Sequence, residues 1–400
     1  MRMRFNRSSQ LVLASAVSLL AAGLVTACST LTVDFVYVTS AQGAGPTSYG
    51  EVDVFEINSE SGRMRQIPTS PFPSGGRNPV AEATSTDNTN LYVVNRDDNS
   101  IVQFAIGNDG KLYPQNTVNT PGVFPMAVNV TGSYLYVADT YQPLPSCSTA
   151  APCSGSIAVF PINKDDSLAT PVANASLSSE YWPLTLPASP TDVMTPTAVT
   201  TASSGAYVYV TAYDSTSVSG YVFGFTVNSD GTLTPMSGGV PFAAGTKPSS
   251  IVADPSGNYV YVTDAAKDQV LTFQVNSGLL SPMSNPASTG NVPAAIVVDG
   301  SGKYAYVANS QDGNLSAYSV SGGVLTWLGT YTTGTQPVAI GIDPSLNEYL
   351  YTANYLDATV SGFQINATDG SLLNSQFSPS KSNALPTAVA AIPHGTRAQK

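Results

Sequence analysis

A short tyrosine-rich motif recurs seven times along the 400-residue chain and constrains its fold more than any other feature. The copies are FVYVTS at 35, LYVVNR at 91, YLYVAD at 134, YVYVTA at 207, YVYVTD at 259, YAYVAN at 304 and YLYTAN at 349. Their second aromatic residues lie 55, 44, 73, 52, 45 and 45 residues apart. A period near 45 residues, lengthened by insertions in three repeats, accommodates four short strands and is typical of a β-propeller blade.

The sequence around each motif completes such a blade. Each copy is followed by a strand with a central aromatic residue, such as VLTFQV at 270. Every copy after the first is preceded by a strand led by proline, such as PSSIV at 248. Turn sequences such as DPSGN at 254–258 join the strands. No sustained helical periodicity follows residue 28. We therefore predict an all-β, seven-bladed propeller with four antiparallel strands per blade.

The two ends of the repeat region are complementary. The chain enters it at residue 35 with a tyrosine motif and leaves it with the proline-led strand PTAVAAIP at 386, which no motif follows. The C-terminal strand is therefore expected to join the N-terminal blade and close the ring, so that no sheet edge is left free. We predict one domain over residues 35–396, with the repeated tyrosines and phenylalanines packed between neighbouring sheets.

The first 28 residues have the pattern of an export signal. MRMRFNR is basic, residues 11–27 are apolar, and VTAC ends the segment at Cys28. Small residues before a cysteine resemble a bacterial lipobox, which implies cleavage of the signal peptide 1–27, lipidation of Cys28 and a linker over 28–34. An ordinary signal peptide or a short membrane anchor is the alternative. We expect an exported, lipid-anchored protein on the periplasmic or cell-surface side, at the outer rather than the inner membrane.

Cys147 and Cys153 lie six residues apart in a loop rich in proline and serine. In an exported protein this spacing predicts a disulfide that closes a small surface loop, with metal ligation or free thiols as the alternatives. The expected mature chain has 12 basic and 26 acidic side chains, hence a net charge of −14. Such an acidic protein lacks the basic face that nucleic acid requires, so we expect no nucleic-acid partner.

The repeats follow the pattern P-x-A-[VI]…G-x-YVYV-[TA]-[ND]…V-x-x-[FY]. This resembles the YVTN-repeat propellers, especially the lactonase family typified by bacterial 6-phosphogluconolactonase, over residues 35–396. The resemblance implies the seven-bladed fold and, more weakly, lactone hydrolysis. Fungal carboxymuconate cyclases share the fold and use a histidine with acidic and basic partners. The single histidine here, His394, stands near the C-terminus, so that arrangement does not carry over.

Insertions into the repeats indicate which face of the ring carries function. Residues 40–50, 140–155 and 213–220 form long loops after a tyrosine motif, while 66–78 and 177–195 form long approaches to a proline-led strand. In a four-stranded meander both kinds of loop open on the same face. We expect that face to bind the ligand or partner.

Glu82 is the sharpest departure from the repeats. At the third position after the leading proline, the other six blades carry Val128, Val199, Ile251, Ile296, Ile340 and Val389. Burying a carboxylate there is costly unless it is paired or protonated. One hypothesis places Glu82 in the central channel as a general base for water, with Arg77 and Arg96 polarising an ester carbonyl. The alternative is a buried ion pair between Glu82 and an arginine, with a structural role only.

Four other side chains are candidates for ligand binding. Lys247 and Tyr213 belong to the same face as Arg77, where a lysine would meet an anionic ligand. Tyr181 and Trp182 lie in an insertion and would stack on a sugar or an apolar ligand. The alternatives are a solvated lysine and a hydrophobic lid over the blade edges.

A ring of polar residues recurs at the end of the tyrosine motif. Its members are Asn95, Asp139, Asp264, Asn309 and Asn354. Their regular register predicts that they cap turns, with Ca²⁺ coordination as the alternative. We expect no cofactor.

Two functions remain from the sequence. The favoured one is a monomeric binding or scaffold propeller that engages a protein, peptide or glycan at the cell envelope, since no nucleophile–histidine–acid set is present. The alternative is a lactone hydrolase that uses Glu82, Arg77 and Arg96.

Overall fold

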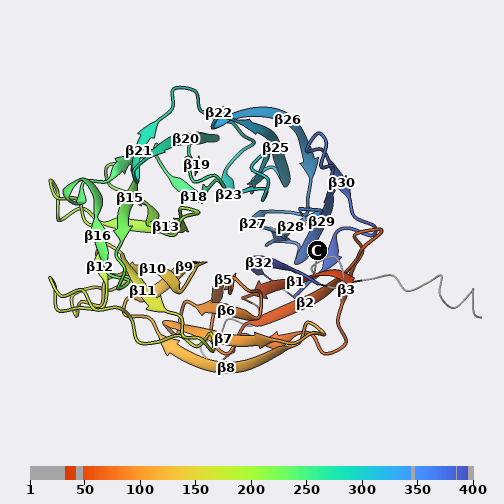
Figure 1. Cartoon of the computed structure of the whole chain (residues 1–400), viewed down its shortest axis with the longest axis horizontal. Helices are drawn as coiled ribbons and strands as arrows, with labels where there is room; N and C mark the ends of the chain where they lie inside the picture. The colour runs from red at the N-terminus through yellow and green to blue at the C-terminus, as the bar shows by residue number, and fades with distance from the viewer. Residues whose placement is uncertain (1–31, 42–47, 344–346, 384, 395–400) are drawn as a thin grey trace, which may run out of the picture.

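The computed structural model describes residues 32–41, 48–343, 347–383 and 385–394, and these form a ring of seven antiparallel sheets (Figure 1). The predicted all-β, seven-bladed propeller is confirmed. The predicted signal peptide and Cys28 lie outside the described residues. We number the blades 1 to 7 from the blade that contains residue 32.

Each blade runs outward from the centre of the ring as a meander. The innermost strands of blades 1 to 7 are β32 (Pro386–Pro393), β5 (Pro79–Thr84), β9 (Val123–Thr131), β13 (Met194–Thr201), β18 (Pro248–Ala253), β23 (Pro293–Val298) and β27 (Pro337–Ile342). The tyrosine motifs form the second strands, β1 (Thr32–Ser40), β6 (Asn90–Asn95), β10 (Tyr134–Tyr141), β14 (Tyr207–Asp214), β19 (Tyr259–Asp264), β24 (Tyr304–Asn309) and β28 (Tyr349–Asn354).

The third strands carry the central aromatic residues. They are β2 (Glu51–Asn58), β7 (Ser100–Ile106), β11 (Ser156–Pro161), β15 (Ser219–Val227), β20 (Gln269–Asn276), β25 (Asn314–Ser321) and β29 (Thr359–Ile365). The outer edge varies most. Four blades split it into two short strands, β3 (Met64–Gln66) with β4 (Phe72–Pro73), β16 (Leu233–Pro235) with β17 (Phe242–Ala243), β21 (Leu279–Pro282) with β22 (Ala287–Ser288), and β30 (Leu372–Asn374) with β31 (Ser380–Lys381).

The other three blades have a single outer strand, namely β8 (Leu112–Asn119), β12 (Trp182–Pro183) and β26 (Val324–Thr332). The 3₁₀ turn η1 (Met236–Gly239) lies between β16 and β17 and is the only helical element among the described residues.

The chain closes the ring as its sequence predicts. β32 pairs antiparallel with β1, with Phe35 opposite Ile392 and Val38 opposite Val389. Each innermost strand also contacts the innermost strands of both neighbouring blades, which completes the circle. Both faces of every sheet are thereby covered by another sheet.

Backbone hydrogen bonds show that the insertions share one face, which we call the elaborated face. The Gly50 amide donates to the Gly76 carbonyl, and the Ser74 amide donates to the Gly50 carbonyl, at 3.0 and 2.8 Å. Likewise the Gly155 amide donates to Met194 at 2.8 Å. The predicted long loops 40–50 and 140–155 therefore each meet a long approach to a first strand. The predicted loop 213–220 is instead a short turn, because β14 continues to Asp214 and β15 begins at Ser219. Within this face, Cys147 and Cys153 form the predicted disulfide.

The seven motif tyrosines form the core between blades. Tyr37, Tyr92, Tyr136, Tyr209, Tyr261, Tyr306 and Tyr351 are all fully buried. Five of them also donate a hydrogen bond to the next blade, as Tyr209 does to the Gly278 carbonyl at 2.8 Å. The hydroxyls of Tyr136 and Tyr261 have no partner among the described residues. The predicted packing role is confirmed.

No helix in the described ranges is long and apolar enough to cross a membrane.

The contribution of the hydrogen bonds between blades can be tested by comparing a motif tyrosine that donates such a bond with one whose hydroxyl has no partner. Tyr209→Phe leaves the buried Gly278 carbonyl without its donor, so we expect the free energy of unfolding to fall by about 1–3 kcal/mol. Tyr136→Phe removes a buried hydroxyl that has no partner, so we expect no loss or a small gain. Urea unfolding of both variants measures the difference. Equal losses in the two variants would show that the hydrogen bond between blades contributes nothing.

Candidate functional site

The start of each innermost strand places a ring of side chains around the axis on the elaborated face. The residues just before the leading prolines are Asn78, Phe124, Thr195, Lys247, Val292, Gln336 and Leu385. The predicted polar ring supports them by capping the preceding turns. Asp264, for example, accepts from the amides of Thr246 and Lys247 at 2.9 and 3.0 Å. Gly245 is required there, because a Cβ would come within 2.2 Å of the Asp264 carboxylate.

Arg77 and Asp98 form a tight pair on blade 2. The Arg77 Nε donates to Asp98 Oδ1 at 2.5 Å, and the Arg77 amide donates to Asp98 Oδ2 at 2.7 Å. Nη2 also contacts Asp98 and donates to the Asp97 carbonyl at 3.0 Å. The hydrogen bond with Asp98 raises the pKa of Arg77. The guanidinium is thus engaged in holding the loop that carries Asp97 and Asp98.

Arg96 is held differently. Its guanidinium lies over the Phe124 ring of blade 3, 4.9 Å from the ring centroid, and Phe124 in turn meets Tyr141 edge-on at 6.0 Å. The Arg96 side chain donates no hydrogen bond within the described part of the chain. Its nearest carboxylate oxygen, Asp97 Oδ1, is 3.7 Å away. A cation on an aromatic face keeps its position while its donors stay available to a ligand.

Asp97 completes this group. Its Oδ1 accepts from Asn78 Nδ2 at 3.3 Å, and its side chain is 39% exposed. We call Arg77, Arg96, Asp97, Asp98 and Phe124 the axial cluster. It presents a guanidinium and a carboxylate to solvent on the predicted face, beside the starts of the innermost strands β5 and β9. Arg77 and Asp98 fix the loop beneath them.

Glu82 does not join Arg77 and Arg96, and here the structure differs from the expected arrangement. Glu82 pairs with Val93 across β5 and β6, so its side chain points between blades, as the valines and isoleucines at equivalent positions do. Its Oε2 accepts a hydrogen bond from the Thr39 hydroxyl of blade 1. Although the residue as a whole is only partly buried, Oε1 is sealed from solvent and has no partner among the described residues. The carboxylate therefore does not face the centre of the ring.

The proposed ion pair for Glu82 is not formed either. No salt bridge joins Glu82 to an arginine in the described structure, where the four ion pairs are Arg65–Glu56, Arg77–Asp98, Arg96–Asp97 and Lys111–Asp109. Burial raises the pKa of Glu82 to about 8, and the hydrogen bond from Thr39 offsets only part of this effect. A raised pKa favours the neutral, protonated form, which lets Glu82 lie between blades without an ion-pair partner.

The remaining predicted residues separate into two places. Lys247 Nζ lies 5.7 Å from the Tyr213 ring centroid, so these two meet on the elaborated face between blades 4 and 5. Trp182 is only 4% exposed and packs in the core shared by blades 3 and 4. Tyr181, next to it, is partly exposed and lines a recess of about 540 Å³.

The described residues contain no group of three or more histidine, cysteine, aspartate or glutamate side chains that could hold a metal ion. His394 instead packs against the ring of Phe35, 4.6 Å between centroids, and burial lowers its pKa.

Two members of the axial cluster, Phe124 and Asp97, were not predicted from the sequence. Phe124 is the only aromatic residue among the seven that precede a leading proline, and this departure was a readable signal. Nothing in the sequence separated Asp97 from Asp98, since either could have paired with Arg77. The choice depends on the path of the loop.

Comparison with known proteins identifies relatives of the whole ring. The family model described as "Lactonase, 7-bladed beta-propeller" matches residues 48–143, 154–288 and 222–342. A comparison with curated protein sequences returned no significant match. Among solved structures, a Bacteroides fragilis protein provisionally named 6-phosphogluconolactonase is 20% identical, with a TM-score of 0.70 over 91% of this chain and 99% of its own. The Pseudomonas aeruginosa periplasmic gluconolactonase PpgL is 18% identical, with a TM-score of 0.70 over 90% and 99%.

The placement of Glu82 predicts a pH-dependent stability. Below the ordinary pKa of 4.5 the carboxyl is protonated in both the folded and the unfolded chain. As the pH rises from there to about 8, the unfolded chain releases the proton first, so the free energy of unfolding falls. Glu82→Gln removes this loss. We expect the variant to exceed the parent by a few kcal/mol at pH 9, at about 1.4 kcal/mol per pKa unit, with little difference at pH 4.

Urea unfolding at pH 4, 6.5 and 9 measures this difference. Glu60→Gln, on an exposed turn, is the control and should match the parent at every pH. A gain for Glu82→Gln that is the same at pH 4 and pH 9 would contradict the protonated state.

Proposed function

The chain belongs to the family of seven-bladed lactonase β-propellers, and from this premise we propose that it hydrolyses a neutral, polyhydroxylated lactone at the axial cluster. The observation that supports this site is Arg96. It combines a fixed position over Phe124 with donors that no described residue uses, beside the exposed carboxylate of Asp97. Preorganised donors of this kind stabilise the charge that develops on a carbonyl oxygen during hydrolysis.

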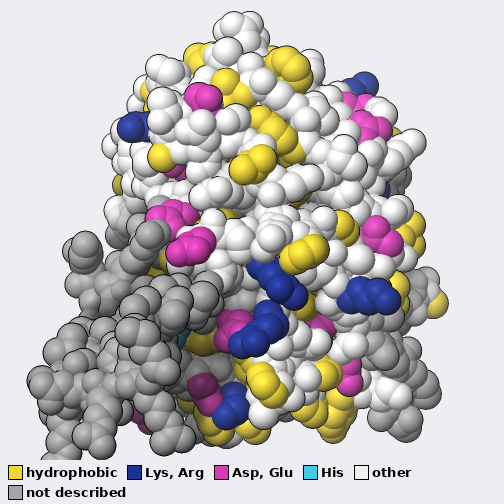
Figure 2. Space-filling model, turned by 90° about the vertical axis from the view of Figure 1, so that its right-hand side faces the viewer, with side chains coloured by type: hydrophobic (Ala, Val, Ile, Leu, Met, Phe, Trp, Pro, Cys, Tyr) yellow, Lys and Arg dark blue, Asp and Glu magenta, His cyan; other side chains and the backbone are white. Residues whose placement is uncertain are grey.

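The charge of the protein favours a neutral substrate over a phosphorylated one. Two arginines and two aspartates make the axial cluster neutral overall, and the whole chain has a net charge of −11. The flank in Figure 2 shows a few basic and acidic side chains close together among mostly uncharged surface. Such a protein attracts anions poorly. A gluconolactone, the substrate class in the name of the Pseudomonas protein, has hydroxyl groups and no charge.

The reaction assigns one role to each exposed group. Arg96 donates hydrogen bonds to the lactone carbonyl oxygen and stabilises its negative charge as water adds to the carbonyl carbon. Asp97 accepts a proton from that water. The ring C–O bond then breaks, and Asp97 returns the proton to the departing ring oxygen, which becomes a hydroxyl. The product is the open-chain hydroxy acid, which loses its proton to solvent at neutral pH.

This proposal reverses the order of the two functions that the sequence favoured. The family match supports lactone chemistry, and the axial cluster supplies an electrophile and a base that do not include Glu82. A binding role at the same face rests on Lys247 and Tyr213, whose cation–π pair would hold a ligand without any reaction.

Substitutions in the axial cluster test the enzyme. We expect Asp97→Asn to lower kcat by roughly 10²–10⁴-fold, because it removes the base. Arg96→Gln should lower kcat by roughly 10²–10³-fold through loss of carbonyl stabilisation. The measurement is pH-stat hydrolysis by the full chain of neutral and phosphorylated sugar lactones.

Glu82→Gln is the matched control and should retain the parent's kcat, since its carboxylate is sealed between blades. Loss of turnover in folded Glu82→Gln with Asp97→Asn unaffected would move the base to Glu82. Absence of turnover on every lactone by the parent would leave the binding role at this face.

We also propose that the protein is exported and anchored by a lipid on Cys28. The leader sequence and the Cys147–Cys153 disulfide support an oxidising compartment outside the cytoplasm. We expect a radiolabelled fatty acid to label the parent, and Cys28→Ser to lose the label and to partition into the aqueous phase of a detergent extraction. The double variant Cys147→Ala/Cys153→Ala should keep the label. A labelled Cys28→Ser protein would contradict the anchor.

A further inference from the structure

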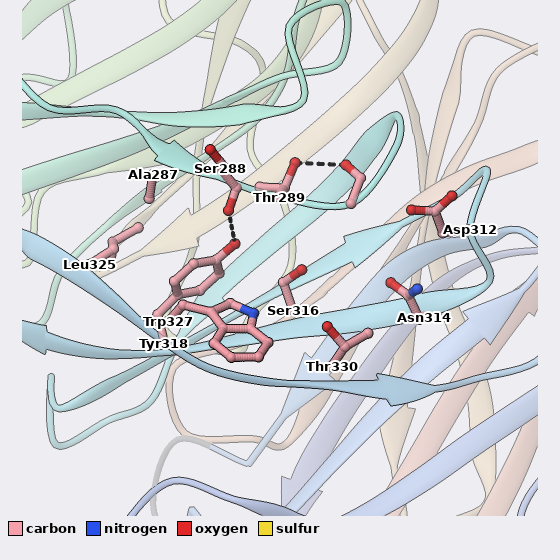
Figure 3. A pocket seen from close by; sticks show the side chains of 11 residues that line it. Ala287, Ser288, Thr289, Asp312, Asn314, Ser316, Tyr318, Leu325, Trp327 and Thr330 are labelled. Atoms are coloured by element: carbon pink, nitrogen blue, oxygen red, sulfur yellow. Dashed lines mark hydrogen bonds between the residues drawn. The ribbon is translucent and has the colours of Figure 1, made fainter.

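The perimeter of the ring carries a second candidate site, between blades 5 and 6 (Figure 3). A pocket of about 360 Å³ lies there, with β22 of blade 5 on one side and β25 and β26 of blade 6 on the other. Its volume is within the range of small-molecule sites. Ser288 and Thr289 form the blade 5 wall, and the side chains of blade 6 form the floor and the opposite wall.

Trp327 is the unusual feature of this pocket. It is 61% exposed, whereas the only other tryptophan, Trp182, is 4% exposed. It stands opposite Tyr318 across β25 and β26, next to a bulge that places Ala317 opposite Gly329. Directly opposed residues project to the same face of a sheet, so the indole lies on the pocket side together with Tyr318 (Figure 3). Nothing among the described residues accepts a hydrogen bond from its indole N–H.

Tyr318, which lies next to Trp327, holds the blade 5 wall of the pocket in place. Tyr318 is buried, and its hydroxyl donates to the Ser288 carbonyl at 2.5 Å. The other six blades have phenylalanine at this position, so the hydroxyl is a departure from the repeat. It joins blade 6 to the edge of blade 5 and holds the pocket at a defined width.

Polar groups line the rest of the pocket, and several are unused. Asn309 Nδ2 donates to Asn314 Oδ1 and Ser316 Oγ at 2.7 and 2.9 Å, which orients both acceptors. The Asn314 Nδ2 group and the Thr330 hydroxyl have no partner within the described part of the chain. Donors and acceptors therefore surround an exposed aromatic face.

Blade 2 provides an internal comparison. It has the same long outer strand, β8, with a bulge at the same place, and Pro114 stands opposite Phe104 there. Its equivalents of Trp327 and Ser316 are thus Pro114 and Val102. Thr330 and Asn314 have polar equivalents in Thr117 and Ser100. The long outer strand alone does not require an exposed tryptophan, so in this comparison Trp327 and Ser316 are specific to blade 6.

We infer that this pocket binds a neutral sugar ring, with Trp327 against its C–H face and Asn314, Thr330 and Ser316 hydrogen-bonded to its hydroxyls. The lining contains no lysine or arginine, and Asp312 would repel an anion. Asp312 already accepts two hydrogen bonds from Asn291, at 2.7 and 2.8 Å, so its charge is partly compensated. A purely apolar ligand would leave the polar walls unpaired. This site is independent of the axial cluster.

Saturation-transfer NMR with the purified full chain, in a detergent without a sugar headgroup, tests this inference. The probes are methyl glycosides of glucose, galactose, mannose and N-acetylglucosamine, with choline as a cationic probe. We expect at least one glycoside to bind saturably and its ring protons to receive the strongest transfer. Trp327→Ala should weaken its affinity at least tenfold and Asn314→Ala about threefold, and Tyr113→Ala, on β8 of blade 2, should have no effect.

The fluorescence of Trp327 provides a second, direct measurement of ligand binding. In the parent, binding should shift the emission of this exposed tryptophan to shorter wavelength, while buried Trp182 stays unchanged. Thermal unfolding at the parent's temperature shows that Trp327→Ala is folded. The inference is overturned if no glycoside binds, if Trp327→Ala binds as well as the parent, or if choline alone binds.

Discussion

The contact between one blade and the next is the interaction on which the whole structure depends. No single sheet can bury both of its faces, so each blade obtains its core only from its neighbours. The motif tyrosine illustrates this, because its ring packs between sheets and, in five blades, its hydroxyl reaches a backbone or side-chain oxygen of the next blade. The last of these bonds, from Tyr351 to Asp34, joins blade 7 to blade 1. Stability therefore depends on closing the circle, which pairing of β32 with β1 achieves.

This dependence explains why the sequence predicts the fold so well. Every blade must present the same two faces at the same spacing. The same aromatic, proline and turn residues therefore recur in all seven repeats of the sequence. The order of strands at the two ends of the chain was enough to predict the closure. The lengths of the insertions were enough to predict which face is elaborated, since hairpin connections alternate between the two ends of a meander.

The regularity of the repeats also explains why the position of Glu82 and the partners of Arg77 and Arg96 were not predicted correctly. Glu82 stands at a position where six blades bury an apolar residue, so strand alternation directs its side chain between sheets whatever its chemistry. The expectation of a channel-lining base gave more weight to chemistry than to this alternation. The partners of Arg77 and Arg96 lie on loops, where no repeat restricts the path. The path of the loop pairs Arg77 with Asp98 and places Arg96 over the ring of Phe124. The sequence alone does not distinguish this pairing from one between Arg77 and Asp97.

The two candidate sites lie in separate parts of the ring, which decides whether one ligand can occupy both. The axial cluster belongs to blades 2 and 3, and the Trp327 pocket belongs to blades 5 and 6, with blade 4 between them on one side and blades 7 and 1 on the other. Because every blade is held by both neighbours, the ring has no hinge that would bring one site to the other. One sugar ring therefore cannot occupy both sites. On the two proposals made above, a site on the perimeter would hold the protein against a larger glycan and leave the proposed lactone site on the axial face accessible from solution.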